Sequence, residues 1–159
     1  MAKARTPPRV PAAIAAAVLL SVPVTAAYEG LRTKPYSDPA GIKTVCYGET
    51  ERAMRTYTAD ECKVLLESRH QRDYAPAVLK CVPGLAQKRE AFAASIDAAY
   101  NAGTIAFCKS RMAQAFNAGR WKEGCDGFSG WYVTAKGKKL VGLVKRREAE
   151  RSLCLSGLS

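Results

Sequence analysis

Two carboxylates and a hydroxyl follow one another closely near residue 30, where the chain has its first acidic residues. Glu29 is the first acid of the sequence, Asp38 follows nine residues later, and Thr44 a further six residues on. Hydrolysis of a glycosidic bond needs one carboxylic acid to protonate the leaving oxygen and a second carboxylate on the other face of the sugar. This pattern is therefore compatible with a glycosidase in which Thr44 places a hydroxyl near the attacking water.

The surroundings of the two acids differ in polarity. Glu29 directly follows an apolar run, where desolvation favours a protonated carboxyl group, whereas Asp38 lies in a polar turn beside Ser37 and should stay ionised. Each residue also has an ordinary structural explanation: a charge at a helix end for Glu29, a turn former for Asp38, and a strand position for Thr44. Taken one at a time, the residues leave both interpretations open.

The elements around these residues predict an α+β fold that is mainly helical. Turn residues and a short alternating stretch predict a small β region over residues 34–57, with a strand near 42–46. Thr58 and Glu61 have the spacing of a capping box, which predicts a helix over 59–72. Apolar residues at helical spacing, ended by Gly103, predict the central core helix over 85–102. Further helices are expected near 109–117, 121–131 and 143–155.

The longer string around the three residues resembles the active-site segment of the phage lysozymes of glycoside hydrolase family 24. In those enzymes a Glu, an Asp and a Thr recur at spacings of nine and six. Further agreements reinforce the resemblance over nearly all of residues 28–155: Gly30, Tyr36, Gly41, Tyr47-Gly48, Asn101-Ala102-Gly103, Trp121 and Trp131. The resemblance implies a lysozyme-like fold, with a small N-terminal β region, a larger helical lobe and an apolar N-terminal segment.

The resemblance also implies roles for individual residues. Glu29 is the expected general acid, Asp38 the base that orients a water, and Thr44 the third member of the triad. The expected reaction is hydrolysis of the β-1,4 bond between N-acetylmuramic acid and N-acetylglucosamine in peptidoglycan, with inversion and with no cofactor or metal. Two pairs of residues are expected to assist, Tyr36 and Tyr47 in substrate binding and Arg146 and Arg147 in support of Glu29, although the arginines could equally form a solvated helix face.

Two positions depart from the usual family pattern. Cys46 stands where many members have Gly, and Glu49 follows Tyr-Gly where His is common. Neither position belongs to the triad. Both are expected to alter the floor of the substrate cleft.

The net charge of +11 predicts attraction to polyanions. A basic module that binds anionic cell-wall polymers without chemistry is therefore the alternative function. It would need the basic and aromatic residues but not the spacing of the three site residues. Nucleic acid is not an expected partner because no recognition motif is present. A metal is not expected either, because the chain has one histidine, His70, and no C-x-x-C pair.

Six cysteines predict up to three disulfides and an oxidising compartment. All of them lie between Cys46 and Cys154, so the N-terminal segment contains none. Six cysteines allow fifteen pairings. Of these we favour Cys46 with Cys62, because a short connection joins the predicted strand to the next helix.

The first 28 residues combine a basic start with an uncharged stretch from Val10 to Tyr28. This pattern is typical of a membrane-inserted segment with a cytoplasmic N-terminus or of a cleavable signal peptide, and a core helix is a third interpretation. Composition leaves the first two about even. Retention is favoured by Glu29, because cleavage after Ala26 would remove the helical turn that holds it.

The segment and the domain together resemble the endolysins with a signal-anchor-release segment. This resemblance implies a segment over residues 1–27 and a catalytic domain over 28–159. Export by the host secretion machinery would leave the protein in the host inner membrane, facing the periplasm and held there transiently through residues 10–27. Release would then yield a periplasmic enzyme, which we expect to be a monomer.

Overall fold

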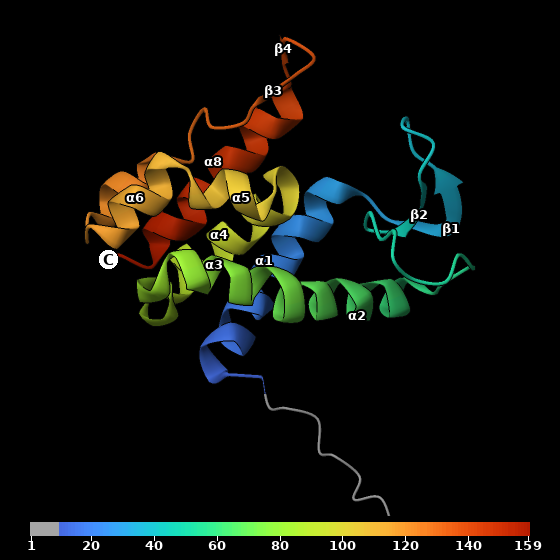
Figure 1. Cartoon of the computed structure of the whole chain (residues 1–159), viewed down its shortest axis with the longest axis horizontal. Helices are drawn as coiled ribbons and strands as arrows, with labels where there is room; N and C mark the ends of the chain where they lie inside the picture. Colours follow the sequence, from blue (N-terminus) through green and yellow to red (C-terminus); the bar gives the residue numbers. More distant parts are fainter. Residues whose placement is uncertain (1–9) are drawn as a thin grey trace, which may run out of the picture.

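The computed structural model describes residues 10–159, so the basic start of the chain lies outside the described residues. The chain forms a helical body with a small β region to one side (Figure 1). The helices are α1 (Ala12–Glu29), α2 (Ala59–Arg69), α3 (Ala75–Cys81), α4 (Arg89–Ala102), α5 (Thr104–Cys108), α6 (Arg111–Asn117), α7 (Trp121–Asp126) and α8 (Val141–Ser156). A π-helix over His70–Tyr74 joins α2 to α3, and a 3-10 helix over Pro83–Gln87 precedes α4.

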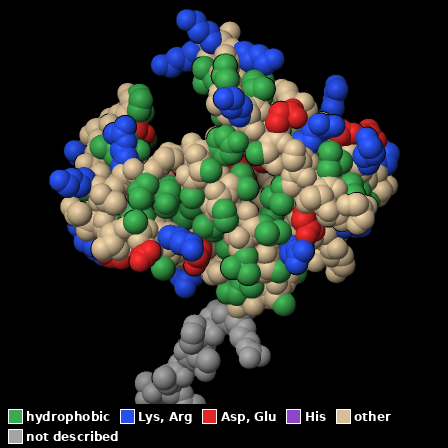
Figure 2. Space-filling view, turned by 180° about the vertical axis from the view of Figure 1, so that it is seen from behind, with side chains coloured by type: hydrophobic (Ala, Val, Ile, Leu, Met, Phe, Trp, Pro, Cys, Tyr) green, Lys and Arg blue, Asp and Glu red, His purple; other side chains and the backbone are tan. Residues whose placement is uncertain are grey.

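Two antiparallel hairpins complete the fold. The first pairs β1 (Arg32–Ser37) with β2 (Lys43–Cys46), and the second pairs β3 (Thr134–Ala135) with β4 (Lys138–Lys139). The turn between β1 and β2 contains Gly41, whose φ of +81° is accessible mainly to glycine. The β3–β4 hairpin projects from the body, and Lys and Arg side chains gather on this projection at the top of Figure 2.

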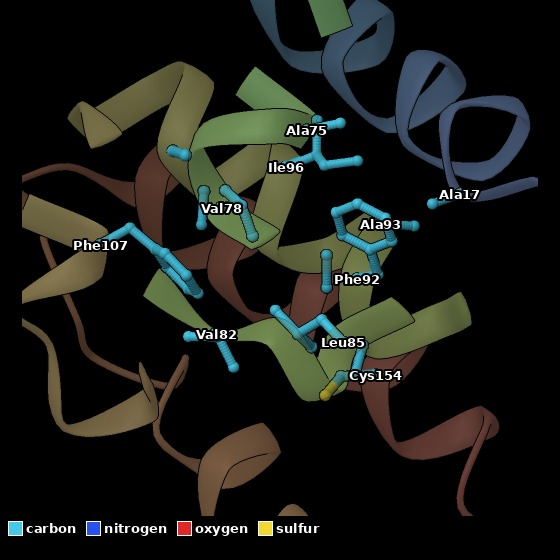
Figure 3. Close-up of a cluster of buried hydrophobic side chains, with 14 of the residues drawn as sticks. Ala17, Ala75, Val78, Val82, Leu85, Phe92, Ala93, Ile96, Phe107 and Cys154 are labelled. Atoms are coloured by element: carbon cyan, nitrogen blue, oxygen red, sulfur yellow. The ribbon is translucent and has the colours of Figure 1, made fainter. Parts of the chain in front are cut away.

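Helix α4 lies at the centre of the hydrophobic core. Every residue from Ala91 to Ala99 is buried, and all of them except Asp97 have apolar or small side chains. Helices α1 and α8 pack against it, and the cluster in Figure 3 joins Phe92 and Ala93 of α4 to Ala17 of α1. The body is therefore built around the helix that the sequence predicts as its core.

Helix α1 brings the apolar N-terminal stretch into this body. Its buried residues recur every three or four positions: Ile14, Ala17, Val18, Ser21, Val22 and Thr25. The opposite side remains apolar but exposed, with Leu19 75% accessible. Within residues 10–159, α1 is also the one helix long and apolar enough to cross a membrane, judged by length and a mean hydropathy of 1.6. The helix continues without a break to Glu29, past the segment boundary expected at residue 27.

Several predicted boundaries are wrong. The helix expected over 59–72 continues through the π-helix into α3, which carries Pro76 in its first turn. The core helix begins at Arg89 rather than at 85, and the helix expected over 121–131 ends at Asp126. The helices expected near 109–117 and 143–155 correspond to α6 and α8. Helices α3 and α5 and the β3–β4 hairpin were not predicted from the sequence.

Three disulfides cross-link the body, as the six cysteines predicted. They join Cys46 to Cys62, Cys81 to Cys108, and Cys125 to Cys154. The favoured pairing of Cys46 with Cys62 is confirmed. Cys46 has a φ of +62°, in the left-handed region that glycine adopts most easily. This conformation gives a physical reason for glycine at the corresponding position of many family members.

Candidate active site

An open cavity lies between the β region and the helical body. It has a volume of about 310 Å³ and receives residues from α1, the segment after β2, α2, the π-helix and α4. Glu29 and Tyr47 are the two predicted site residues among its lining residues. The others are Gly48, Glu49, Thr50, Glu51, Arg69, Tyr74, Tyr100 and Asn101.

Glu29 is the last residue of α1, and its side chain is 24% exposed. Gly30 follows with a φ of +73°, so the chain leaves the helix there and enters β1. Arg146 of α8, which is almost fully buried, donates from Nη1 to Glu29 Oε1 at 2.8 Å. The surroundings of Glu29 are therefore not purely apolar, because a fixed positive charge contacts its carboxylate.

The second predicted arginine does not reach Glu29. Arg147 is fully buried and donates to both carboxylate oxygens of Glu150, at 2.7 and 2.6 Å, and to the side chain of Asn101. Its guanidinium also lies 5.2 Å from the ring centre of Trp131. Arg147 therefore holds α8 to α4 and to the loop after α7. Of the two arginines, Arg146 is the one that contacts Glu29.

Asp38 and Thr44 lie in the β region, where a shared backbone contact brings them together. Asp38 Oδ1 accepts hydrogen bonds from the backbone N–H groups of Ala40 and Ile42, both at 2.9 Å. The carbonyl oxygen of Ile42 accepts from the Asp38 N–H at 2.9 Å and from the Thr44 hydroxyl at 3.0 Å. Thr44 is buried and Asp38 is partly exposed. The turn thus fixes both side chains relative to one backbone unit.

The two predicted tyrosines occupy different places. Tyr47 lines the cavity beside Glu29, and its carbonyl oxygen accepts a hydrogen bond from the Tyr100 hydroxyl. Tyr36 pairs with Thr44 across the β1–β2 hairpin and stacks under the guanidinium of Arg32, 4.3 Å from the ring centre. Tyr36 does not line the cavity.

A buried ion pair forms part of the cavity wall at the position where the family often has His. Glu49 is 5% exposed and accepts from Arg69 Nε at 2.9 Å and from Arg69 Nη2 at 2.7 Å. Burial raises the pKa of Glu49, but the hydrogen bonds from Arg69 and from the Glu51 N–H, together with the charges of Arg69 and Arg52, hold the pKa below its ordinary value. Glu49 thus lines the cavity, and its effect on the substrate cleft stays a prediction.

Asp97 of α4 is a site residue that the sequence analysis missed. It is fully buried, and Arg146 grips it with two hydrogen bonds, from Nε to Oδ2 at 2.9 Å and from Nη2 to Oδ1 at 2.7 Å. Burial raises the pKa of Asp97, but the hydrogen bonds from Arg146 and neighbouring side chains have the larger combined effect. The pKa therefore lies below its ordinary value, and the carboxylate is ionised. A signal was available, because Asp97 is an acid on the apolar side of the predicted core helix.

His70 connects the same network to α1. Ser21 Oγ lies 2.7 Å from His70 Nδ1, and Thr25 Oγ1 lies 3.2 Å from His70 Nε2 and 2.5 Å from Asp97 Oδ1. Burial is the main reason that the pKa of His70 falls to about 4, so the ring is neutral near pH 7. The π-helix that carries His70 turns its ring toward α1, and such π segments are frequent at functional sites.

Comparison with known proteins connects this arrangement to one family. The family model described as phage lysozyme matches residues 26–150. A SAR-endolysin of Bacteriophage PS119 is 37% identical over 135 residues, which cover 81% of this chain and 77% of that protein. A SAR-endolysin of Enterobacteria phage P21 is 33% identical over 168 residues, covering 95% of this chain and 98% of that protein.

Solved structures agree with the sequence matches. The active form of the P1 phage endolysin Lyz superposes with a TM-score of 0.68 at 27% identity, covering 91% of this chain and 85% of that one. A P22 lysozyme variant has the same TM-score of 0.68 at 24% identity and supports the fold alone. The predicted lysozyme-like fold is confirmed.

Proposed function

The chain belongs to the phage lysozyme family, and from this premise we propose that Glu29, Asp38 and Thr44 are its catalytic residues. The enzyme class follows from the family: the protein is an endolysin, a lysozyme that hydrolyses the glycosidic bonds of peptidoglycan. The alternative, a basic binding module without chemistry, is not favoured.

The observation that carries the residue assignment is the position of Glu29. It lies at the end of a helix, borders an open cavity, and keeps part of its carboxyl group accessible while Arg146 holds one oxygen. An acid fixed in this way is placed to protonate the leaving oxygen of a bound sugar. Tyr47 borders the same cavity and supplies a ring surface for the substrate.

Asp38 and Thr44 supply the second half of the proposed reaction. In the described chain both hydrogen bonds to the Asp38 carboxylate fall on Oδ1, which leaves Oδ2 to accept one from a water. The Thr44 hydroxyl donates to Ile42, so its lone pairs can orient the same water. Attack by this water on the face opposite Glu29 inverts the anomeric carbon.

The family also supports a proposal for α1. Membrane anchoring followed by release agrees with the SAR-endolysin relatives and with the apolar helix. Eighteen helical residues extend about 27 Å, close to the thickness of a hydrocarbon core of about 30 Å. We therefore assign the packed α1 to the released enzyme. In the proposed anchored state, secretion places the body on the periplasmic side of the host inner membrane.

The test is the reaction product. Purified enzyme acting on peptidoglycan sacculi should release fragments with reducing N-acetylmuramic acid ends, as cleavage of its β-1,4 bond to N-acetylglucosamine requires. The Glu29→Gln variant should release none, because the amide cannot donate the proton. Glu123→Gln is the matched control, because Glu123 lies on the exposed surface of α7.

Two results would contradict the assignment. Activity of Glu29→Gln near the wild-type rate would remove Glu29 from the role of acid. Loss of activity in both Glu→Gln variants would show that the change of charge, rather than position 29, matters. Circular dichroism of each variant checks that the helices are intact.

A further inference from the structure

We propose that Thr25 and Asp97 are positioning residues that set the geometry of Glu29 through Arg146. This inference rests on the proposed role of Glu29 as the acid. It goes beyond that role because it names the contacts by which the docked helix α1 completes the site. Neither residue touches the cavity, so both act through another side chain.

The hydrogen bonds between α1, His70 and Asp97 have defined directions. The Thr25 hydroxyl donates to Asp97 Oδ1 at 2.5 Å, so its oxygen accepts the proton of His70 Nε2. His70 Nδ1 is then the acceptor for the Ser21 hydroxyl at 2.7 Å. One neutral tautomer of the ring therefore satisfies both hydroxyl groups of α1.

The guanidinium of Arg146 contacts two carboxylates at once. Its Nε and Nη2 donate to the two oxygens of Asp97, and its Nη1 donates to Glu29 at 2.8 Å. A guanidinium group is planar, so the plane set by Asp97 fixes the direction in which Nη1 points. Asp97 thereby determines where Arg146 meets the Glu29 carboxylate.

The pair of Asp97 and Arg146 is buried. The side chains of Asp97 and Arg146 are 0% and 3% exposed, so water cannot replace a lost partner. Leaving a buried charge without its partner is strongly unfavourable, and the arginine would turn toward its remaining carboxylate, Glu29. Catalysis is sensitive to displacements of about 1 Å, so such a turn should lower turnover.

Helix α1 carries both the acid and the hydroxyl contacts. Thr25 and Glu29 both belong to this helix, and Ser21 adds a third contact one turn earlier. The hydroxyl groups of α1 thus meet their buried partners only when the helix is docked in the body. Docking of α1 and alignment of the acid are therefore one event.

The experiment measures kcat and KM of the purified, detergent-free full chain on soluble peptidoglycan fragments. The variants are Asp97→Asn, Thr25→Val and Thr25→Ser, with Glu29→Gln in the same series. Thr56→Val and Asp60→Asn are matched controls, because both residues are exposed and make no side-chain hydrogen bond within residues 10–159. The melting temperature of each variant is recorded, and assays run well below it.

Asp97→Asn should lower kcat about 10- to 100-fold with KM within about twofold of wild type. Thr25→Val should lower kcat about 3- to 10-fold, and Thr25→Ser, which restores the hydroxyl, should return it to within about twofold. A purely structural role would instead lower the melting temperature and leave kcat unchanged. Thr25→Val offers an independent test should Asp97→Asn fail to fold.

Three results would overturn the inference. One is a kcat equal to wild type in both Asp97→Asn and Thr25→Val while Glu29→Gln is inactive. This result would leave the proposed function intact. Another is equal loss in Thr25→Val and Thr25→Ser, because the hydroxyl would then not be the active group. The last is an active Glu29→Gln, which removes the proposed function together with the inference.

Discussion

Thr25 and Glu29 lie one turn apart on α1, and the buried pair of Asp97 and Arg146 bridges them from outside the helix. A single stretch of α1 thus carries the acid and one of the contacts that orient it.

Arg146→Lys keeps the charge but removes the fork that contacts two carboxylates. Lysine is a point charge and cannot hold Asp97 and Glu29 in one plane, so kcat should fall at least about tenfold. Arg151→Lys is the control, because Arg151 pairs with Asp126 at the surface. Turnover of Arg146→Lys equal to that of the control would show that the charge alone is sufficient.

Acid should destabilise the protein through His70. The ring takes up a proton near pH 6.5 when unfolded but only at a pKa of about 4 in the fold, chiefly because it is buried. The unfolded state therefore binds more protons between these values, and the free energy of unfolding falls as pH drops from 6.5 to 4. Its neighbours act in opposite directions, since Asp97 favours and Arg146 disfavours the charged ring.

The loss from His70 should be about 3 kcal/mol. Denaturant unfolding at pH 7 and pH 4 measures it when wild type is compared with His70→Gln, which cannot titrate. Carboxylates that do not interact with His70 affect both proteins alike, so the difference reports the ring together with its coupling to Asp97. Equal pH dependence in the two proteins would show that His70 is not neutral in the fold.

The exposed and buried faces of α1 should respond differently to leucine. Ala12 is exposed and Ala15 borders an open surface hollow, whereas Ala17 is fully buried. Ala12→Leu with Ala15→Leu should favour the membrane by about 0.5 kcal/mol each and delay lysis in cells, while the purified soluble form stays active. Ala17→Leu should also overpack the body, costing about 1 to 3 kcal/mol of stability.

Membrane fractionation, lysis timing and assay of the soluble form distinguish these variants. Lysis on the wild-type schedule by the Ala12/Ala15 double variant, with the protein still in the membrane, would contradict the proposed release. Mature protein that begins at Ala27 would contradict retention of the segment.

The disulfide of Cys46 should both cross-link and hold a strained residue. Replacing Cys46 and Cys62 with alanine removes a link that spans 16 residues and should cost about 3 kcal/mol. The variant with Cys46→Gly and Cys62→Ala should lose about 1 kcal/mol less free energy of unfolding than the double alanine variant, because glycine adopts the φ of +62° without strain. Thermal unfolding of the two variants gives the comparison, and equal stabilities would argue against strain at residue 46.

Asp38 should direct inversion rather than attack the sugar. The first product should have the opposite anomeric configuration from the substrate, which proton NMR of early time points detects, and the two carboxyl groups should be separated by about 6.5 to 9.5 Å in a substrate complex. A covalent glycosyl adduct on Asp38 would overturn the assignment.

Short-range patterns predicted the elements whose signals are local. The capping box of Thr58 and Glu61 forms as expected, and Gly103 ends α4. The predictions failed where tertiary packing decides. Helices α3 and α5 are too short for a clear period, and the π-helix continues α2 beyond the predicted end near residue 72.

The site residues also divide into those with a local sequence signal and those brought together by tertiary packing. Glu29, Asp38 and Thr44 lie within sixteen residues, so one string of sequence holds them and allows their prediction. His70, Asp97 and Arg146 come from three other helices, and no spacing in the sequence indicates that they meet. The choice of Arg146 over Arg147 depends on the rotation of α8, which sequence periodicity does not fix to a single residue.

The three disulfides all lie between Cys46 and Cys154, so none ties α1 to the rest of the chain. If α1 leaves a membrane as proposed, no covalent bond has to form or break for it to dock. All three disulfides of the body can form before α1 docks. Activation would then need no thiol chemistry, would proceed as fast as the helix can move, and would in principle run in both directions.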